Sequence, residues 1–379
     1  IYKNGVRVIF GYPGGSVLPV YDRLRSSRIK HYMPTHEQHA CHAADGYARA
    51  SGRTGVVLAT SGPGATNLVT GIANAYMDSV PLVAITGNVP LPLLGHDAFQ
   101  ETDIAGVTMP ITKHNFIVKN ADELAPTLSA AFRIAGSGRK GPVLVDIPSD
   151  LLYAPVRDGG GEPLPKKHIA LSDAELQEAA ELIDGAKHPF ICVGGGVVSS
   201  DATEAVKKLA ELTGASVAVT AMGKGGFPSS DAHYVGLVGM RIGQATAAAL
   251  HHCDLFIACG VRFSERLMKN IQTYAPKARI LHFDIDAAEI GKNAEIYSRV
   301  LNEALERILP GLTARGTVFA TRKKAKKPVL FEVLGELLPD AIYTTEVGLH
   351  QLDAAEWLDI DKPRHFISSG GLGADCLRQ

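Results

Sequence analysis

The stretch GVVLATSGPGATNLVTGIANAYMDSVPLVAITG, residues Gly55–Gly87, decides the fold class. It contains two apolar runs, Gly55–Thr60 and Pro81–Thr86, and each of them closes on a glycine-containing turn. Short apolar strands that stop at glycine or proline and alternate with Ala- and Leu-rich helical segments are typical of a parallel sheet covered on both faces. The stretch therefore predicts a strand–helix–strand unit of an α/β protein.

The same pattern continues on both sides of this unit. In the first domain it predicts the strands Val6–Tyr12, Ile29–Met33 and Pro142–Ile147 and the helix His39–Ala50. A second series follows the linker 157–168, with strands Pro189–Val193, Ser216–Thr220, Leu255–Gly260 and Arg279–Asp284 and helix Ala202–Leu212. A third series, after a linker with the basic run 322–327, opens with helix Val329–Leu338 and strand Ala341–Thr345. We expect consecutive doubly wound parallel-sheet domains over 1–155, 169–312 and 329–379, the last of them incomplete.

Composition excludes several classes of protein. The 379 residues correspond to roughly two and a half domains of about 150 residues. Apolar residues make up 46% and the net charge is −1, which excludes a disordered chain and gives no global electrostatic case for binding nucleic acid or an anionic membrane. No apolar run is long enough for a membrane span. The five cysteines (Cys41, Cys192, Cys253, Cys259, Cys376) are scattered, which favours buried thiols in a reducing compartment.

The densest polar cluster is His36-Glu37-Gln38-His39-Ala40-Cys41-His42. A zinc-protease motif starting at His36 needs a histidine where the chain has Ala40, so that interpretation fails. His39 and His42 are one helical turn apart, but no third metal ligand stands at a suitable spacing. Glu37 follows a strand and precedes a helix, which suits either a polar helix start or a carboxylate placed for proton transfer.

Glycine-rich turns follow several of the predicted strands. Ser61–Gly64 and Gly194–Gly196 each lie between a strand and a helix, where a ligand can approach the backbone closely. An ordinary tight turn is the alternative at both places. Asp284 and Asp286 follow another strand, a position typical of carboxylates that hold ribose hydroxyls or of simple helix caps.

Long motifs, taken in order, identify a family. In the first domain they are GYPGGSVLPVYDRL (Gly11–Leu24), HEQHACHAADGYARASG (His36–Gly52), SGPGATNLVTGIANAYMDSVPLVAITG (Ser61–Gly87), DAFQETDIAGVTMPITKHN (Asp97–Asn115) and GPVLVDIPSD (Gly141–Asp150). Further on they are TAMGKGGFP (Thr220–Pro228), GLVGM (Gly236–Met240), GVRFSERL (Gly260–Leu267), HFDIDAAEIGKN (His282–Asn293), TTEVGLHQ (Thr344–Gln351) and PRHFISSGGLG (Pro363–Gly373). In this order they resemble the catalytic subunit of acetolactate (acetohydroxyacid) synthase, a thiamine-diphosphate enzyme family.

The resemblance implies a pyrimidine-binding domain, a central FAD-binding domain and the start of a diphosphate-binding domain. It also implies thiamine diphosphate, Mg²⁺ and FAD as cofactors. The family decarboxylates pyruvate and joins the two-carbon unit to pyruvate or 2-oxobutyrate, in branched-chain amino-acid biosynthesis. The glutamate that matches Glu37 bonds a nitrogen of the aminopyrimidine ring and promotes removal of the thiazolium proton.

The other site residues are likewise carried over from the resemblance. Cofactor-binding positions match Gly14, Gly15, Asn67, Gly194, Gly195, Thr220, Met222, Arg262, Asp284, Asp286, Gly348 and His350, and positions near the second-substrate pocket match Phe99, Gln100 and Lys113. The family also implies a cytoplasmic homodimer or tetramer, with a possible small regulatory subunit.

The chain departs from the family pattern in places. Asn88 stands where the family usually has Gln, and Arg241-Ile242 replaces a His-Gly pair near the flavin. The family's magnesium-binding segment does not follow Gly373, and no metal ligand is assigned. We therefore expect a truncated synthase in which this exact polypeptide has weak or absent turnover.

Two other functions stay open. Another thiamine-diphosphate enzyme, such as pyruvate oxidase or glyoxylate carboligase, would share these domains. Glu37 argues against the carboligase, since that family has an apolar residue there, and the DAFQE and ITKHN runs favour the synthase over the oxidase. A non-catalytic FAD-binding paralogue is the third possibility, and flavin absorbance without thiamine-diphosphate binding would favour it.

Overall fold

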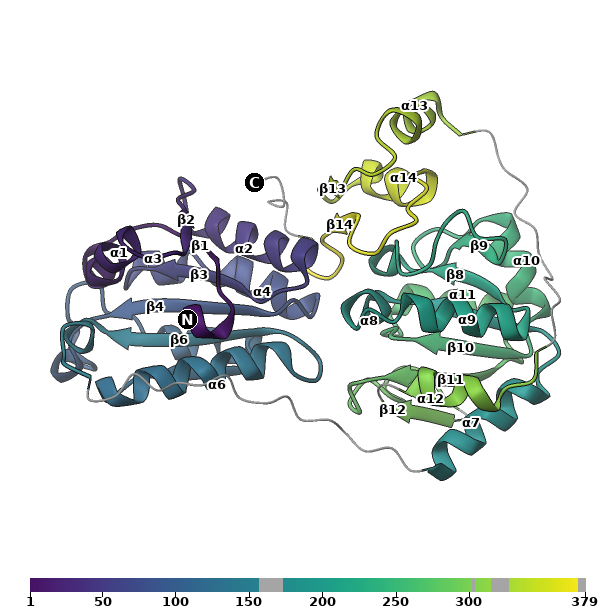
Figure 1. Ribbon diagram of the computed structural model, residues 1–379, viewed down its shortest axis with the longest axis horizontal. Coiled ribbons are helices and arrows are strands. Elements are labelled where there is room, and N and C mark those ends of the chain that lie inside the picture. Colours follow the sequence, from purple (N-terminus) through teal and green to yellow (C-terminus); the bar gives the residue numbers. More distant parts are fainter. Residues whose placement is uncertain (157–172, 297, 302–303, 315–326, 374–379) are drawn as a thin grey trace. The chain divides into compact units, whose positions relative to one another are not determined.

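The computed structural model describes residues 1–156, 173–296, 298–301, 304–314 and 327–373. The linker expected over 157–168, Cys376 and the basic run apart from Lys327 lie outside these ranges. The chain divides into two compact units, Ile1–Lys167 with Ser369–Gln379, and His168–Ser368 (Figure 1). The residues expected to open a third domain thus belong to the second unit as far as Ser368.

The described part of the first unit is built on a parallel sheet of six strands in the order β2-β1-β3-β4-β6-β5. The strands are β1 (Val8–Gly11), β2 (Lys30–Tyr32), β3 (Gly55–Ala59), β4 (Leu82–Asn88), β5 (His114–Ile117) and β6 (Pro142–Pro148). The helices are α1 (Leu18–Arg25), α2 (Glu37–Ser51), α3 (Pro63–Thr66), α4 (Val69–Met77), α5 (Ile104–Thr108) and α6 (Leu124–Gly136).

Helices cover both faces of this sheet, and its central strands are mostly apolar. Every residue of β3, β4 and β6 is buried. Alternate side chains of β3 enter opposite cores: Val57 packs with α2 and α4, whereas Val56 and Leu58 face the core that includes α6. Figure 1 shows α2 and α4 on one side and α6 on the other. The doubly wound α/β prediction is confirmed.

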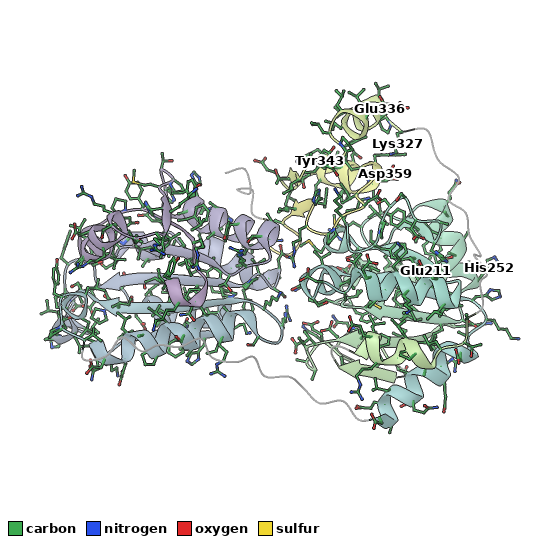
Figure 2. All side chains as sticks on the ribbon, viewed as in Figure 1. Glu211, His252, Lys327, Glu336, Tyr343 and Asp359 are labelled. Atoms are coloured by element: carbon green, nitrogen blue, oxygen red, sulfur yellow. The ribbon has the colours of Figure 1, made fainter. Side chains whose placement is uncertain are left out.

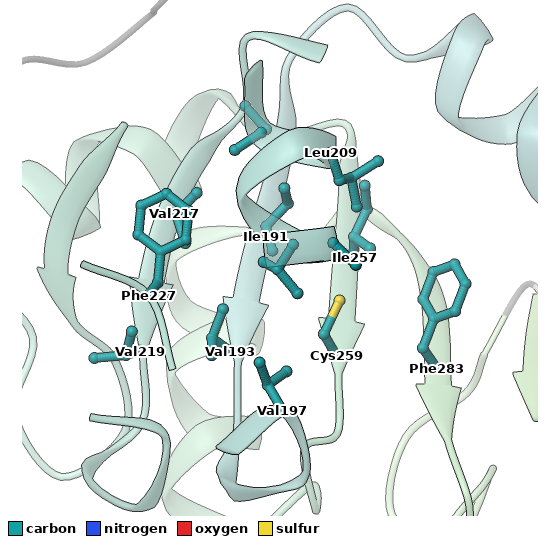
Figure 3. Close-up of a cluster of buried hydrophobic side chains, with 14 of the residues drawn as sticks. Ile191, Val193, Val197, Leu209, Val217, Val219, Phe227, Ile257, Cys259 and Phe283 are labelled. Atoms are coloured by element: carbon teal, nitrogen blue, oxygen red, sulfur yellow. The ribbon is translucent and has the colours of Figure 1, made fainter. Parts of the chain in front are cut away.

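The second unit repeats the design. Its six described parallel strands run in the order β12-β11-β10-β7-β8-β9. They are β7 (Pro189–Val193), β8 (Ser216–Val219), β9 (Tyr234–Leu237), β10 (Leu255–Cys259), β11 (Arg279–Asp284) and β12 (Ser298–Leu301). The helices are α7 (Asp173–Gly185), α8 (Gly195–Ser199), α9 (Thr203–Thr213), α10 (Gln244–His252), α11 (Glu265–Tyr274) and α12 (Ala304–Ile308). Figure 3 shows Ile191, Val217 and Ile257 of three neighbouring strands in the same buried cluster as Leu209 of α9.

The segment 327–368 adds a small two-stranded parallel sheet to this unit. Its elements are α13 (Val329–Leu337), β13 (Tyr343–Thr345), α14 (Leu349–Trp357) and β14 (Phe366–Ser368). Tyr343 Oη donates to the carbonyls of Leu334 and Leu338 at 3.1 and 2.9 Å, and Lys327 pairs with Asp359 (Figure 2). The first contacts tie α13 to β13, and the ion pair joins the chain just before α13 to the chain just after α14.

Each large sheet has a point at which its winding direction reverses between two neighbouring strands. In the first, β2 lies on one side of β1 and β3 on the other; in the second, the reversal falls between β7 and β10. Ligands of doubly wound proteins bind beyond the carboxyl ends of the strands at such a switch point. The loops after β1 and β3, and after β7 and β10, are therefore where binding residues are to be sought. No helix in the described ranges is long and apolar enough to cross a membrane.

Candidate active site

Glu37 lies at the amino end of α2, on the carboxyl side of β2. His36 caps this helix, with Nδ1 accepting from the Gln38 N–H at 3.1 Å. Glu37 Oε2 accepts a hydrogen bond from Asn67 Nδ2 at 2.9 Å. The unpaired N–H groups of a first helical turn favour negative charge there. The structure thus brings Glu37 and Asn67, 30 residues apart in the sequence, into direct contact.

The loops after β1 and β3 are joined at the switch point. Ser16 Oγ lies 2.9 Å from Thr60 Oγ1 and accepts the Ser61 N–H at 3.0 Å. A Cβ added at Gly14 would stand 2.4 Å from Thr60 Cβ, so this position requires glycine. A Cβ at Gly15 would meet nothing within 4 Å in the described part of the chain. Internal packing therefore explains why position 14 is glycine, but it does not explain the glycine at position 15.

Gly64 lies beside Glu37 Oε1, the carboxylate oxygen that does not bond Asn67. Because glycine has no side chain, the space next to this oxygen stays open. A Cβ there would lie 3.3 Å from Glu37 Oε1 and 2.7 Å from Thr60 Cγ2. Among the described residues Glu37 Oε1 has no hydrogen-bonding partner. One carboxylate oxygen is thus oriented by the protein, and the other is available to a ligand.

The loop that carries Phe99 and Gln100 packs on the same region. Gly62 has φ +57°, and a Cβ there would stand 2.8 Å from the Gln100 carbonyl oxygen. Glu101 holds the loop by accepting the N–H groups of Gly95 and Ala98, and these hydrogen bonds lower the pKa of its carboxyl group. Phe99 is 88% exposed. Two of the predicted substrate residues therefore lie on a loop that contacts the turn beside Glu37.

Lys113 lies elsewhere in the first unit. It directly precedes β5, at the amino edge of the sheet, and its Nζ donates to the carbonyls of Ile134 and Ser137 at the end of α6. Within the described residues it caps that helix, as cations near helix carboxyl ends commonly do. A role of Lys113 in substrate binding stays a prediction.

A buried acid near the carboxyl edge was missed by the sequence reasoning. Asp146 of β6 is 1% exposed and accepts hydrogen bonds from Thr86 Oγ1 at 2.6 Å and Asn88 Nδ2 at 2.5 Å. Burial raises the pKa of Asp146 to about 6, although the two hydrogen bonds act in the opposite direction. Asn88, a departure from the family pattern, thus has a partner here. The available signal was one aspartate inside the otherwise apolar run Pro142–Ile147.

Tyr21 is a second residue that the sequence reasoning passed over, and its hydroxyl oxygen is buried. Burial, and then the negative charge of Glu37, raise the pKa of its hydroxyl group. The Tyr21 ring meets the His31 ring edge to face, with centroids 5.0 Å apart. A Cβ at Gly11 would stand 2.7 Å from Tyr21 Oη, so Gly11 makes room for the hydroxyl group.

The glycines at the second switch point are crowded by backbone atoms. A Cβ at Gly194 would lie 2.1 Å from the Gly260 carbonyl oxygen, and one at Gly223 would lie 2.1 Å from that of Val193. Gly195 packs against Met222, and Thr220 Oγ1 caps the next turn by accepting the Gly223 N–H at 3.1 Å. The predicted positions Gly194, Gly195, Thr220 and Met222 are thus brought together after β7 and β8.

Asp284 and Asp286 turn the chain at the end of β11. Asp284 Oδ1 accepts the Asp286 N–H at 2.9 Å, and Asp286 Oδ1 accepts the Ala288 N–H at 3.0 Å. Asp284 Oδ2 lies 3.5 Å from His282 Nε2. Arg262 follows β10, the neighbouring strand, and has no ion pair among the described residues. Carboxylates and a guanidinium therefore lie along one sheet edge.

Gly348 and His350 begin α14. Gly348 has φ +152°, and a Cβ there would stand 3.0 Å from His350 Nδ1. His350 is exposed. Arg241, the residue that replaces the family's histidine, pairs with Asp353 and Glu356 of this helix at 2.6 and 2.8 Å.

The histidine cluster after His36 does not assemble a metal site in the described residues. Cys41 and His42 are both fully buried. A Cβ at Gly71 would stand 2.6 Å from Cys41 Sγ, so the thiol fills space against α4, and burial raises its pKa.

Two protein-family descriptions match the chain. The thiamine pyrophosphate enzyme N-terminal TPP binding domain matches residues 1–107, and the thiamine pyrophosphate enzyme central domain matches residues 176–308. The first range contains Glu37 and Asn67, and the second contains the glycines of the second switch point.

Curated relatives from bacteria and archaea are similar over nearly the whole chain. Acetolactate synthase of Mycobacterium bovis is 45% identical over 97% of the chain and 65% of its own length. The probable acetolactate synthase large subunit of Methanocaldococcus jannaschii is 43% identical over 98% and 69%, respectively. The acetolactate synthase isozyme 2 large subunit of Escherichia coli is 39% identical over 98% and 71%. The chain thus spans about two thirds of the length of these relatives.

Proposed function

The chain belongs to the acetolactate synthase large-subunit family of thiamine pyrophosphate enzymes, and from this premise we propose that it decarboxylates pyruvate and transfers the two-carbon unit to a second 2-oxo acid. The acceptor is pyruvate or 2-oxobutyrate. The observation that carries the proposal is the Glu37 carboxylate at the first switch point, with one oxygen held by Asn67 and the other available.

The residues around Glu37 fit the aminopyrimidine half of thiamine diphosphate. When bound, this cofactor supplies the carbanion chemistry that decarboxylation and carbon–carbon bond formation require. Glu37 Oε1 would hold a ring nitrogen and exchange a proton with it, because the absent side chain at Gly64 leaves that oxygen accessible. Asn67 would keep the carboxylate oriented by donating to Oε2. Gly15, which internal packing does not require, would let the cofactor approach the backbone.

The described residues support the proposals for magnesium and for FAD to different extents. We propose Mg²⁺ as the cation that accompanies the diphosphate of the cofactor. Across the described ranges, no group of three His, Cys, Asp or Glu side chains converges to hold a metal ion, so no residue is assigned to Mg²⁺ and no step is derived through it. For FAD, the donor set at the second switch point is suitable. Arg262 would bind the diphosphate and Asp284 a ribose hydroxyl, with Gly194, Gly195, Thr220, Met222 and Asp286 around them.

The remaining parts of the proposal concern assembly and location. We propose a cytoplasmic enzyme that acts as a homodimer or tetramer, with a small regulatory subunit as a further partner. The names of several relatives, which describe a large subunit, support a second kind of subunit. A sedimentation measurement on the purified protein tests the oligomeric state.

The test of activity supplies the protein that carries this sequence with thiamine diphosphate, Mg²⁺, FAD and pyruvate, and measures acetolactate. We expect weak formation of acetolactate at most from this exact polypeptide, and any rate that it has should decrease about 10²- to 10⁴-fold in Glu37→Gln, because the amide cannot exchange the proton. The matched control is Glu211→Gln on α9, an exposed glutamate (Figure 2), which leaves the rate unchanged.

Other results of the same measurements would support the alternative functions. Acetyl phosphate in place of acetolactate would indicate a pyruvate oxidase. A flavin absorbance band without binding of thiamine diphosphate would indicate a non-catalytic FAD-binding protein. Equal rates in Glu37→Gln and the unchanged protein would remove Glu37 from the chemistry.

A further inference from the structure

Three charged side chains are buried between α2 and the end of α4. Arg49 Nε lies 2.5 Å from Asp45 Oδ1, and Arg49 Nη2 lies 2.9 Å from Asp78 Oδ2. The side chains of both aspartates are completely buried, and that of Arg49 is 10% exposed. Burying charges costs free energy unless each of them is paired and hydrogen-bonded.

Asp78 has a particular need for donors. It is the residue that ends α4, where the helix dipole is negative and disfavours a carboxylate. Arg49 supplies one charged partner. The glycine-rich turn that belongs to the same unit supplies two more donors, because Gly370 N–H donates to Asp78 Oδ2 at 3.0 Å and Gly371 N–H donates to Oδ1 at 2.8 Å. Consecutive backbone amides of this kind form an anion-binding concavity.

Asn74 joins the turn to the rest of the charged group. Its Nδ2 donates to Asp45 Oδ2 at 3.2 Å, and its Oδ1 accepts from Ser369 Oγ at 2.7 Å. Ser369 Oγ in turn accepts the Gly373 N–H at 3.2 Å. The turn is thus held by two side chains that are one helical turn apart, Asn74 within α4 and Asp78 at its end.

The shape of the contact selects glycine at its centre. A Cβ at Gly371 would stand 2.8 Å from Met77 Cβ and 3.0 Å from Asp78 Oδ1. An alanine would therefore push the turn away from the carboxylate without altering any charge.

We propose that Asp45, Arg49, Asn74 and Asp78 form a docking site for the Ser369–Gly373 turn, and that Asp78 is its anchoring residue. The Asp78 carboxylate binds the backbone amides of the turn. Docking therefore depends on the negative charge of Asp78 and on the absence of a side chain at Gly371. Because Asp45 and Arg49 belong to α2, occupation of the site also fixes the carboxyl-terminal half of the helix whose first residue is Glu37.

The test measures hydrogen exchange by mass spectrometry in the full chain, on peptides that cover residues 369–373. We expect Asp78→Asn and Gly371→Ala each to accelerate exchange of the turn amides about 10- to 100-fold, the effect of losing hydrogen bonds to a charged group. Because both substitutions break the same contact, the double variant should exchange within about threefold of the faster single variant. Asp78→Glu, which restores the charge, should recover part of the protection.

The controls are matched to each substitution. Asp340→Asn removes an exposed carboxylate that pairs with Lys362, and Gly335→Ala adds a Cβ that meets nothing within 4 Å. Neither should alter exchange of the turn. Unchanged turn exchange in Gly371→Ala, or effects that multiply in the double variant, would overturn the proposal. Gly371→Ala leaves the buried charges intact, so its result stands even where Asp78→Asn unfolds the first unit.

Discussion

The two switch points have the same topology but are closed by different atoms. After β1 and β3, the space that a side chain at Gly14 or Gly64 would take is occupied by side-chain atoms of Thr60. At the second switch point, the space at Gly194 and Gly223 is occupied by the carbonyl groups of Gly260, which follows β10, and of Val193 in β7, respectively. At Gly14 and Gly64 the first edge is therefore shaped by a side chain that a substitution can trim, although Gly11 and Gly62 of the same edge meet the carbonyl oxygens of Leu58 and Gln100. At Gly194 and Gly223 the second edge is shaped by backbone, which cannot be trimmed.

This difference separates two meanings of a glycine-rich turn. At the second edge, glycine is required by the fold itself, and its presence says little about a ligand. At the first edge, Gly64 keeps the Glu37 carboxylate accessible, and Gly15 has no structural requirement in the described residues. Glycines that packing leaves unexplained are thus the more informative ones for function.

The largest expected change in stability is at Gly223, on the second edge, where backbone atoms crowd the glycine. Gly223→Ala places a Cβ 2.1 Å from the Val193 carbonyl oxygen, and we expect a loss of about 3 kcal/mol in the free energy of unfolding of the second unit. Urea unfolding measures it. Gly185→Ala in α7 adds a Cβ with nothing within 4 Å and is the matched control. Equal stability of the two variants would break the comparison.

The next effect concerns Asp146, the buried acid of the first sheet. The pKa of Asp146 is raised from 3.8 to about 6, so the folded state binds this proton more tightly than the unfolded state between those pH values. Its contribution to stability therefore decreases as the pH rises from about 4 to about 6, by up to about 3 kcal/mol, and is constant above.

The Asp146→Asn variant isolates this contribution. Because the amide does not titrate, the stability difference between the unchanged protein and the variant should be larger at pH 4.5 than at pH 7.5, as measured by urea unfolding at each pH. A difference that is independent of pH would contradict the raised pKa.

A smaller effect is expected at Gly64. Alanine there stands 2.7 Å from Thr60 Cγ2, and we expect a cost of about 1–2 kcal/mol. Thr60→Ser removes that methyl group but keeps the Oγ that bonds Ser16, so the double variant should regain most of the stability. No such rescue is open to Gly223→Ala. If Thr60→Ser gives no recovery, the clash lies elsewhere.

The smallest change in stability is expected at Gly15. Gly15→Ala should alter the free energy of unfolding by less than about 0.5 kcal/mol, because the added Cβ meets nothing within 4 Å. If Gly15 faces thiamine diphosphate as proposed, its affinity should nevertheless decrease, which calorimetric titration measures. Unchanged affinity would remove this glycine from the cofactor site.

Sequence patterns were sufficient to predict the central strands of both large sheets and the exposed strand β2, but β5 and the mostly buried strand β9 were not predicted. Apolar runs such as Pro189–Val193 announce central strands, and that strand was predicted with its exact observed bounds. β5 (His114–Ile117) has no buried residue, so its sequence carries no such signal. Short edge strands depend on their neighbours for hydrogen bonds, and their pairing is decided by tertiary structure.

The candidate site divides in a similar way. Glu37 and Asn67 could be named from motifs, but their contact depends on how two loops meet. The partners of Arg241 lie 112 and 115 residues away, on α14, so its local sequence could not identify them. Asp146 stood inside an apolar run, and only the structure shows that Thr86 and Asn88 accompany it.

The turn at Ser369–Gly373 has a consequence for the order in which the protein is made. Asp78 and the Gly370 amide that it binds are separated by 292 residues. At a synthesis rate of about 5–20 residues per second, roughly 15–60 s pass between the appearance of one and of the other. During that interval the nascent first unit has a carboxylate at the end of α4 without two of its hydrogen-bond donors. Full protection of this helix end therefore comes late in synthesis, long after the sheet that supports it has been translated.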